Sequence, residues 1–314
     1  MFKSNPARCS IRSYINRLLR YEAALVISLL FVVLSVISYE LRLLNSQLVI
    51  NNVIEKETDY EEFRKLLISE DSIKQIKSEI DYILKSKPEY KGVLYMDSIG
   101  YLTLSMMARD FDLINNSPID KTTFIRGMAR LASTRRFREL YLYYKAIFSD
   151  AVFFPVAKME GSDIHYSNSW YNKRTYGGLR KHEGCDIMAD NNLRGYYPVI
   201  SITDGIIEKM GWLELGGYRI GIRSDSGGYF YYAHLYDYAP DLKLGDRVVA
   251  GQLLGFMGDS GYGPEGTTGK FDVHLHLGIY VNSDLPDTGE MSVNPYYLLK
   301  LLEKNRISMQ NNNN

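Results

Sequence analysis

The sequence has 314 residues, enough for one or two domains that each bury a hydrophobic core. Its 37 basic and 37 acidic side chains give a formal net charge of zero at pH 7. This balance argues against a nucleic-acid-binding protein, and the overall charge indicates no other particular partner.

The N-terminal segment predicts a membrane anchor. Residues 1–20 contain five basic side chains and no acidic one, and residues 23–39 then contain no charged side chain. This apolar run reaches the lower end of the roughly 17–25 residues that cross a bilayer. Because basic flanks stay in the cytoplasm, we expect a cytoplasmic tail at residues 1–20 and a single transmembrane helix at residues 21–44. The remainder then lies outside the cell membrane.

Two alternatives to an uncleaved anchor are a buried core helix and a cleaved signal peptide. A core helix is rarely apolar on every side. A signal peptide has a shorter apolar region of about 7–15 residues and a small-x-small cleavage site after it. The segment SYELRLLNSQ at 38–47 contains no such site. In the anchored topology Cys9 and Cys185 lie on opposite sides of the membrane and cannot pair, so a hydrophobic core must hold the external part together.

Residues 45–150 predict a helical region. Thr58 and Glu61 have the spacing of a capping box, and isoleucines recur at helical intervals from 73 to 83. We expect Pro88 to end that helix, and further helices at 105–114 and, singly or as a pair, within 121–148. The region contains no histidine, so we expect a spacer or a module that binds a cell-wall or membrane protein.

From residue 151 onward the composition becomes typical of a β domain. Glycine is frequent, and short β-forming runs alternate with Gly, Asp and Asn. We expect a mainly β domain at residues 151–308 and a polar tail at residues 309–314. The runs that predict strands are 197–202, 205–212, 218–224, 228–235 and 246–258.

The histidines gather in this β-rich half. In RKHEGCDIMAD, His182 and Asp186 share one face if the segment is extended, and Cys185 points to the other. In KFDVHLHLGIY, His274 and His276 likewise share a face, together with Asp272. An H-x-H pair alone on a strand is more often incidental than a metal site, and Asp272 is either an exposed residue or one that orients an imidazole.

Taken together, the two segments offer the ligands of a zinc site. Catalytic zinc binds three protein ligands, typically imidazole nitrogens or carboxylate oxygens, and a water. Three ligands drawn from His182, Asp186, His274 and His276 would leave one imidazole free for acid–base chemistry.

With HEGCD at 182–186, YAHL at 232–235 and HLH at 274–276 in this order, residues 152–298 resemble the M23 family of zinc metallopeptidases, the LytM-like and lysostaphin-like peptidoglycan endopeptidases. The resemblance implies antiparallel sheets of the barrel-sandwich hybrid type. By position it implies that His182, Asp186 and His276 bind Zn²⁺ and that His274 and His234 are catalytic, sharing activation of the water and stabilisation of the oxyanion.

Two nearby residues are left outside the implied site. Glu183 follows a ligand but points off its face, and no second histidine completes an H-E-x-x-H motif, so Glu183 is not the expected base. His165 matches no part of the M23 pattern and is expected at the surface.

The resemblance implies a membrane-anchored endopeptidase that cuts the stem peptide or cross-bridge of peptidoglycan. The tyrosines of GYFYYAHLYDY would line its substrate groove or serve as ordinary strand residues. One alternative is a carrier domain, since 242–261 resembles the turn-and-strand unit of lipoyl and biotinyl carriers, but its turn AGQ lacks the lysine that accepts the cofactor. The other is a non-enzymatic scaffold or activator of cell-wall enzymes. The presence of all three ligands and both catalytic histidines favours the enzyme.

Overall fold

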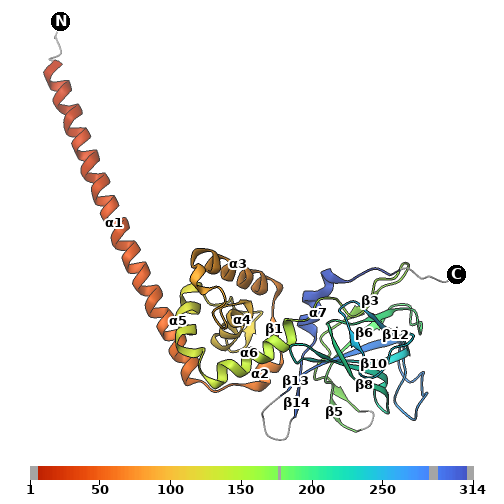
Figure 1. Cartoon of the computed structure of the whole chain (residues 1–314). Helices are drawn as coiled ribbons and strands as arrows, with labels where there is room; N and C mark the ends of the chain where they lie inside the picture. The colour runs from red at the N-terminus through yellow and green to blue at the C-terminus, as the bar shows by residue number, and fades with distance from the viewer. Residues whose placement is uncertain (1–5, 176–177, 283–288, 310–314) are drawn as a thin grey trace. The chain divides into compact units, whose positions relative to one another are not determined.

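The computed structural model describes residues 6–175, 178–282 and 289–309 (Figure 1). Residues up to Glu55 form one compact unit, and residues from Lys56 onward form a second. The predicted polar tail lies largely outside the described residues, as does the start of the basic tail.

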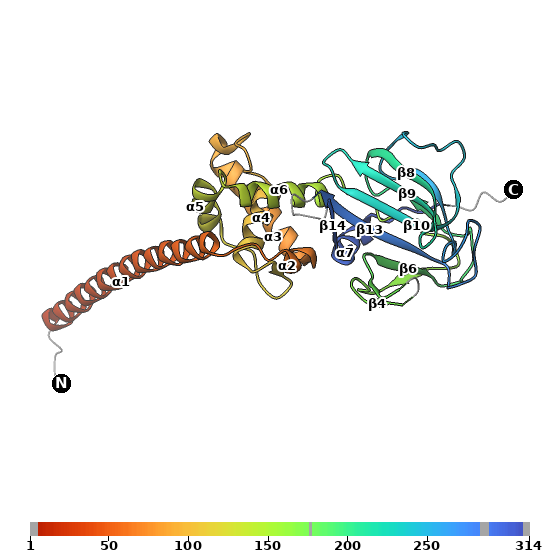
Figure 2. The same ribbon diagram turned by 90° about the horizontal axis from the view of Figure 1, so that it is seen from below.

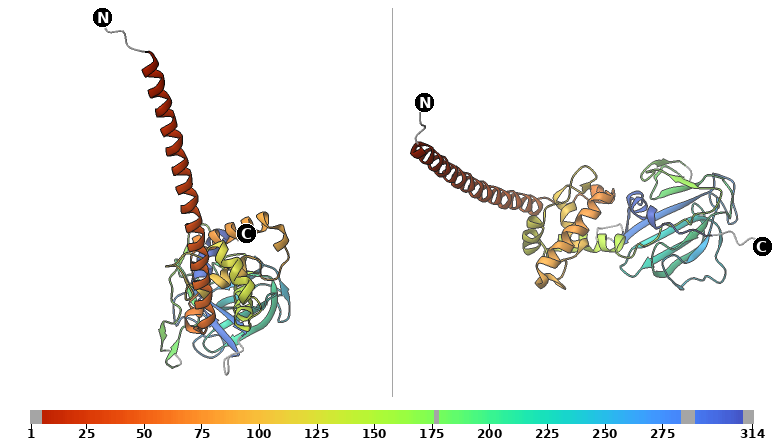
Figure 3. Two further views of the ribbon diagram at one scale, coloured as in Figure 1. Left: turned by 90° about the vertical axis from the view of Figure 1, so that its left-hand side faces the viewer. Right: turned by 90° about the horizontal axis from the view of Figure 1, so that it is seen from above.

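The first unit is the single helix α1, Pro6–Glu55, which Figure 3 shows from two sides as one unbroken helix. Its segment Asn16–Glu55 is long and apolar enough to cross a membrane, with a mean hydropathy of 2.3 over its most apolar window. Side chains such as Leu25, Val26 and Phe31 are exposed on all sides. At 1.5 Å per residue the helix is about 75 Å long, well beyond the roughly 30 Å of a bilayer's apolar layer.

The second unit begins with helices arranged around α4 (Figure 1). Residues 100–107 of α4 are all buried, which explains why this segment shows no single apolar face in the sequence. Ser69, Asp97, Asp120 and Thr134 cap four of the helices through their side chains. The elements are α2 (Tyr60–Arg64), β1 (Leu67–Ile68), α3 (Glu70–Ser86), η1 (Pro88–Tyr90), α4 (Ser98–Ala108), β2 (Asp112–Leu113), α5 (Lys121–Leu131) and α6 (Arg135–Phe148).

Two sequence predictions in this region were wrong in detail. The N-cap of α2 is Asp59 rather than Thr58, and its carboxylate accepts from the Glu62 N–H. Asp is the stronger cap of the two, and the Thr58 hydroxyl accepts instead from Arg136. The helix expected at 105–114 is α4 at Ser98–Ala108, because positive φ angles of 50° and 62° at Asp110 and Phe111 turn the chain into β2.

The expected β domain is confirmed, with a short helix near its end. Ten strands form one antiparallel sheet in the order β11-β8-β9-β10-β13-β6-β3, while β12 pairs with β10 and β7, and β14 pairs with β13. The strands are β3 (Ile164–Tyr166), β4 (Lys173–Arg174), β5 (Arg180–Lys181), β6 (Cys185–Ala189), β7 (Pro198–Ile200), β8 (Gly205–Leu213), β9 (Gly217–Ser224), β10 (Tyr229–Tyr238), β11 (Arg247–Val248), β12 (Leu253–Met257), β13 (His274–Asn282) and β14 (Glu290–Val293), followed by α7 (Tyr296–Leu302) and η2 (Glu303–Asn305).

The central strands β8, β9, β10 and β13 lie side by side and present two different faces (Figure 2). One face is the core, with Ile220, Phe230 and Leu277 fully buried. Strand alternation sends the neighbouring residues to the opposite face, where Arg219, Tyr231 and His276 line a cleft. The sheet thus forms the floor of the site.

The helical region and the β domain share contacts within the second unit. The backbone N–H of Asn294 donates to the Arg64 carbonyl over 2.8 Å. The Arg64 guanidinium donates in turn to the carbonyl and the hydroxyl of Ser292, each over 2.8 Å. Helix α2 therefore lies against β14.

Candidate metal centre

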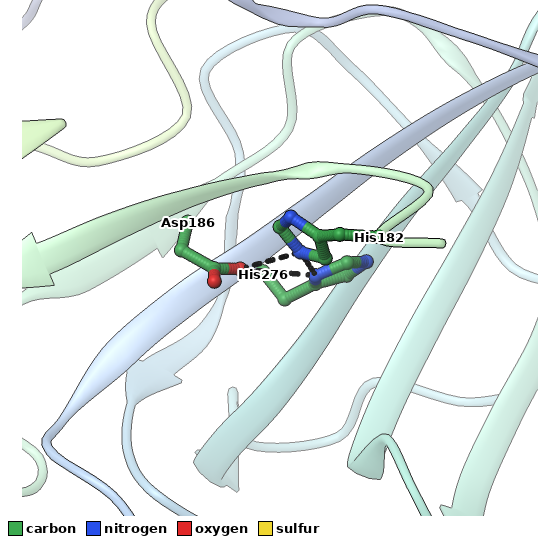
Figure 4. Close-up of side chains that lie close together, drawn as sticks. All are labelled: His182, Asp186 and His276. Carbon is green, nitrogen blue, oxygen red and sulfur yellow. Dashed lines mark hydrogen bonds and ion pairs between the residues drawn. The ribbon is translucent and has the colours of Figure 1, made fainter. Parts of the chain in front are cut away.

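Three side chains from separate elements bring donor atoms to one point (Figure 4). His182 Nε2 lies 2.9 Å from His276 Nδ1 and 3.0 Å from Asp186 Oδ1. His276 Nδ1 lies 3.1 Å from the same carboxylate oxygen. The donors form a nearly equilateral triangle, and all three side chains are at least 86% buried.

The pairing of β6 with β13 builds this triangle. Asp186 and His276 are directly opposite in the antiparallel register, so their side chains share a face. His182 lies just after β5 and reaches the same point. Gly184 makes the approach feasible, because a Cβ there would lie 2.4 Å from His276 Cε1 and 2.6 Å from His276 Nε2.

The triangle fits a zinc ion. Ligands bound tetrahedrally at about 2.0–2.1 Å are separated by roughly 3.3 Å, close to the separations seen here. His182 Nδ1 lies 2.8 Å from the Ser169 carbonyl, which fixes the proton on Nδ1 and leaves the Nε2 lone pair facing the other two donors. Two imidazole nitrogens and a carboxylate suit Zn²⁺ better than Mg²⁺ or Ca²⁺, which prefer oxygen.

The electrostatics of Asp186 and His276 favour the ionised carboxylate and the neutral imidazole, the forms that can bind a metal. Burial raises the pKa of Asp186, but its contacts with His182 and His276 and the charges of the neighbouring histidines outweigh burial and hold that pKa well below its usual range. Arg174 on β4 also pairs with the other Asp186 oxygen. Burial lowers the pKa of His276, which favours the neutral imidazole.

Two further histidines flank the triangle. His274 Nε2 lies 3.8 Å from Asp186 Oδ1, and the ring centres of His274 and His234 are 4.7 Å apart. Burial lowers the pKa of both histidines, that of His234 strongly. Each ring has its Nδ1 2.7 Å from a backbone carbonyl, that of Asp272 for His274 and that of Ser260 for His234. Both Nε2 atoms are thereby left as proton acceptors.

A backbone irregularity places His234 in the cleft. Strict alternation along β10 would send His234 to the core side with Tyr232. The register to β9 shifts between Tyr232 and Leu235, and His234 has a φ of +64°. Such a conformation costs a non-glycine residue about 1–3 kcal/mol and is common at functional sites.

The remaining residues singled out in the sequence are separate from the triangle. Cys185 is fully buried behind it, and burial raises the pKa of its thiol to about 12. His165 is at the surface, as predicted, and contacts Asp190. The Glu183 side chain is half-exposed. Of the two alternatives for Asp272, the exposed residue is confirmed. Its carboxylate accepts from Asn192 and orients no imidazole, and only its backbone carbonyl contacts His274.

Sequence reasoning missed several contributors to the site. The carbonyls of Ser169 and Ser260 fix two histidine tautomers, but a backbone group leaves no residue signature. Arg174 was also missed, because it lies twelve positions before Asp186 in an unremarkable basic stretch. Gly184 lies within HEGCD, midway between His182 and Asp186 on the same face of an extended segment. That position was the sequence signal for a close approach of another side chain.

A cleft of about 790 Å³ surrounds the triangle and follows the exposed face of the sheet. Its walls combine aromatic and charged side chains. The lining residues are Arg174, Arg180, Lys181, His182, Glu183, Asp186, Lys209, Leu213, Leu215, Gly216, Arg219, Tyr229, Tyr231, Ala233, His234, Tyr262, Phe271, His274, His276, Tyr280 and Glu290.

Comparisons with known proteins agree with this geometry. The family model described as Peptidase family M23 matches residues 180–288. The crystal structure of a Ruminococcus gnavus protein assigned as glycyl-glycine endopeptidase LytM is 39% identical, with a TM-score of 0.66, and the match covers 83% of this chain and 98% of that one. The shared sequence and fold thus extend well beyond the β domain.

Two curated relatives match over shorter stretches. The L-Ala–D-Glu endopeptidase of Bacillus subtilis is 43% identical over 143 residues, which are 46% of this chain and 42% of that protein. The glycyl-glycine endopeptidase ALE-1 of Staphylococcus capitis is 31% identical over 166 residues, which are 49% of this chain and 42% of that protein. The chain therefore spans less than half the length of either curated relative.

Proposed function

Because the chain belongs to peptidase family M23, we propose that it is a zinc-dependent endopeptidase that hydrolyses peptide bonds of peptidoglycan outside the cell membrane. The observation that carries the proposal is the triangle of His182, Asp186 and His276 with two further neutral imidazoles beside it. In this proposal the triangle holds the metal and His274 and His234 are catalytic.

A bound zinc ion supplies Lewis acidity toward the scissile carbonyl and lowers the pKa of a water. The chain's own contribution is proton transfer and charge stabilisation. His274 and His234 each donate through Nδ1 to a backbone carbonyl, so each Nε2 can accept a proton from the attacking water and return it to the leaving amine. The protonated ring can also stabilise the developing oxyanion.

The cleft suits an extended peptide. Tyr229, Tyr231 and Tyr280 lie along its floor on β10 and β13, and Phe271 and Tyr262 enclose His234. The relatives named above act on L-Ala–D-Glu and glycyl-glycine bonds. We therefore place the substrate of this chain among the stem-peptide and cross-bridge amides of the wall.

We also propose that α1 anchors the enzyme. Its exposed apolar segment would cross the membrane once, with the basic N-terminus in the cytoplasm and the second unit outside. Protease added to spheroplasts should then digest a C-terminal epitope and spare an N-terminal one. The helical region beside the β domain would be the part that contacts a wall or membrane protein partner.

The test uses the full chain purified in detergent. We expect about one zinc per chain and release of peptides from purified cell walls. His276→Ala should lose both zinc and hydrolysis. His274→Ala should keep zinc and lose hydrolysis by at least about 100-fold. A zinc-loaded wild type that releases no peptide from any wall would support the non-enzymatic scaffold instead.

A further inference from the structure

Basic side chains outnumber acidic ones in the cleft. Among the described lining residues, five are Arg or Lys and three are Asp or Glu. The acids are already engaged. Asp186 belongs to the triangle, Glu290 pairs with Arg223, and Glu183 lies 4.0 Å from Arg64. The cleft therefore carries positive charge that its described acidic side chains do not neutralise.

Arg219 on β9 is the basic residue of the cleft for which an unneutralised charge is clearest. Its Nη1 is buried and has no hydrogen-bond partner within the described part of the chain. Burial raises the pKa of Tyr229 and Tyr231, and the charge of Arg219 partly opposes this, so the guanidinium lies near both hydroxyls. A buried guanidinium nitrogen without an acceptor is costly, and a carboxylate is its best-matched partner.

Lys209 places a second positive charge beside Arg219. Lys209 pairs with Gly221 and Gly211 pairs with Arg219, so the two basic residues are diagonal neighbours on the same face, with backbones about 7–8 Å apart. Gly211 and Gly221 contribute no side chain to this face, and the Tyr229 ring lies over Gly221. The two like charges repel each other, and a bound anion would relieve that repulsion.

Arg223, four residues further along β9 and on the same face, is an arginine whose charge is neutralised within the protein. Its guanidinium donates to Glu208 over 2.8 Å and also pairs with Glu290. Arg219 has the same strand, face and residue type, but no acid among the residues that the structure describes is paired with it. The difference indicates that its acceptor comes from a bound molecule.

The register sets how far this acceptor lies from the reacting bond. His276 on β13 is opposite Ala233 on β10, and Arg219 lies on β9 level with the irregularity beside Ala233. Arg219 is therefore two strands from the ligand His276, about 10 Å at the backbone. An extended peptide covers that distance in about three residues.

We propose that Arg219, assisted by Lys209, binds a free carboxylate within about three residues of the scissile amide, so that the cleft selects acidic stem peptides over neutral oligoglycine bridges. The inference rests on the proposed endopeptidase function and specifies its substrate class.

The test compares matched peptides with the zinc-loaded full chain. One contains an L-Ala–D-Glu bond whose glutamate keeps a free carboxylate, the second carries the corresponding primary amide, and the third is pentaglycine. We expect kcat/KM for the acid to exceed that for the amide by about 10- to 100-fold. Arg219→Gln should bring the acid down to the level of the amide with zinc content unchanged, and Arg219→Lys should keep part of the preference. Arg223→Gln is the matched control and should keep the full preference.

The outcomes separate this inference from the function on which it rests. Equal cleavage of acid and amide by the wild type, or an equal loss on both peptides in Arg219→Gln, would overturn the carboxylate subsite while leaving the endopeptidase intact. Failure of the zinc-loaded wild type on all three peptides and on whole walls would instead count against the endopeptidase itself.

Discussion

The guanidinium of Arg64 lies 4.9 Å from the ring centre of Tyr171, joining helix α2 to the segment that precedes the proposed metal ligand His182. Tyr171 donates its N–H to the His182 carbonyl over 2.7 Å, and the Ser169 carbonyl fixes the His182 ring. Trp170 stacks on Tyr171 with ring centres 3.6 Å apart. The helical region is thus part of the support of the site.

We expect Arg64→Leu to weaken zinc binding by about tenfold, because removal of a contact behind a ligand loosens its orientation. The measurement is zinc affinity by competition with a chromophoric chelator. Arg138→Leu, a change at an exposed arginine on α6, is the control and should leave the affinity unchanged. Equal affinities in wild type and Arg64→Leu would show that α2 does not support the metal centre.

Gly184→Ala should abolish zinc binding and hydrolysis. The added Cβ would lie 2.4 Å from His276 Cε1, and the backbone of the neighbouring strand blocks retreat, since the Leu277 carbonyl oxygen would lie 2.6 Å away. Either the His276 ring or strand β13 must shift, and either shift separates the donor atoms of the triangle. Metal analysis of the purified variant measures the effect.

The adjacent Glu183→Ala is the matched control for this change. Its side chain is half-exposed and points away from the triangle, so zinc content should stay at the wild-type level. Full zinc occupancy in Gly184→Ala would mean that the close approach of Gly184 to His276 is not required.

Much of this site could be predicted from sequence because strand alternation is strict where it matters. The period of two puts Asp186 and His276 on the open face of their strands, and it sends Cys185 and Leu275 into the core. Alternation fails for His234, because the irregularity in β10 turns this residue to the cleft face. No propensity in YYAHL signals a positive φ, and only the resemblance to a family placed that histidine at the site.

The helical region was harder to predict in detail for a different reason. Helix α4 is buried all round, so its sequence lacks the one-sided periodicity that sets helix bounds. Its start depends on Asp97, whose carboxylate accepts from Gly100 N–H over 2.7 Å and from the Tyr141 hydroxyl over 2.8 Å. Tertiary contacts of this kind cannot be deduced from local pattern.

The strain at His234 can be measured by comparing two substitutions. His234→Ala and His234→Gly both remove the ring and should both be inactive. Only glycine accepts a φ of +64° without steric cost, so His234→Gly should unfold with a free energy about 1 kcal/mol higher than His234→Ala. Urea denaturation measures the difference, and Ala233→Gly gives the effect of glycine at a neighbouring strand position. If the alanine variant proves the more stable, the backbone at 234 is not strained.

Removal of the metal should destabilise the second unit. A ligand that binds only the folded state adds about 4 kcal/mol when present at 1,000 times its dissociation constant, so a chelator should lower the unfolding temperature and zinc should restore it. Magnesium should not restore it, since two of the three donors are imidazole nitrogens. His182→Ala supplies the control, because without its Nε2 the triangle is incomplete and neither chelator nor zinc should shift the transition. A zinc-dependent shift that persists in His182→Ala would place the metal elsewhere in the protein.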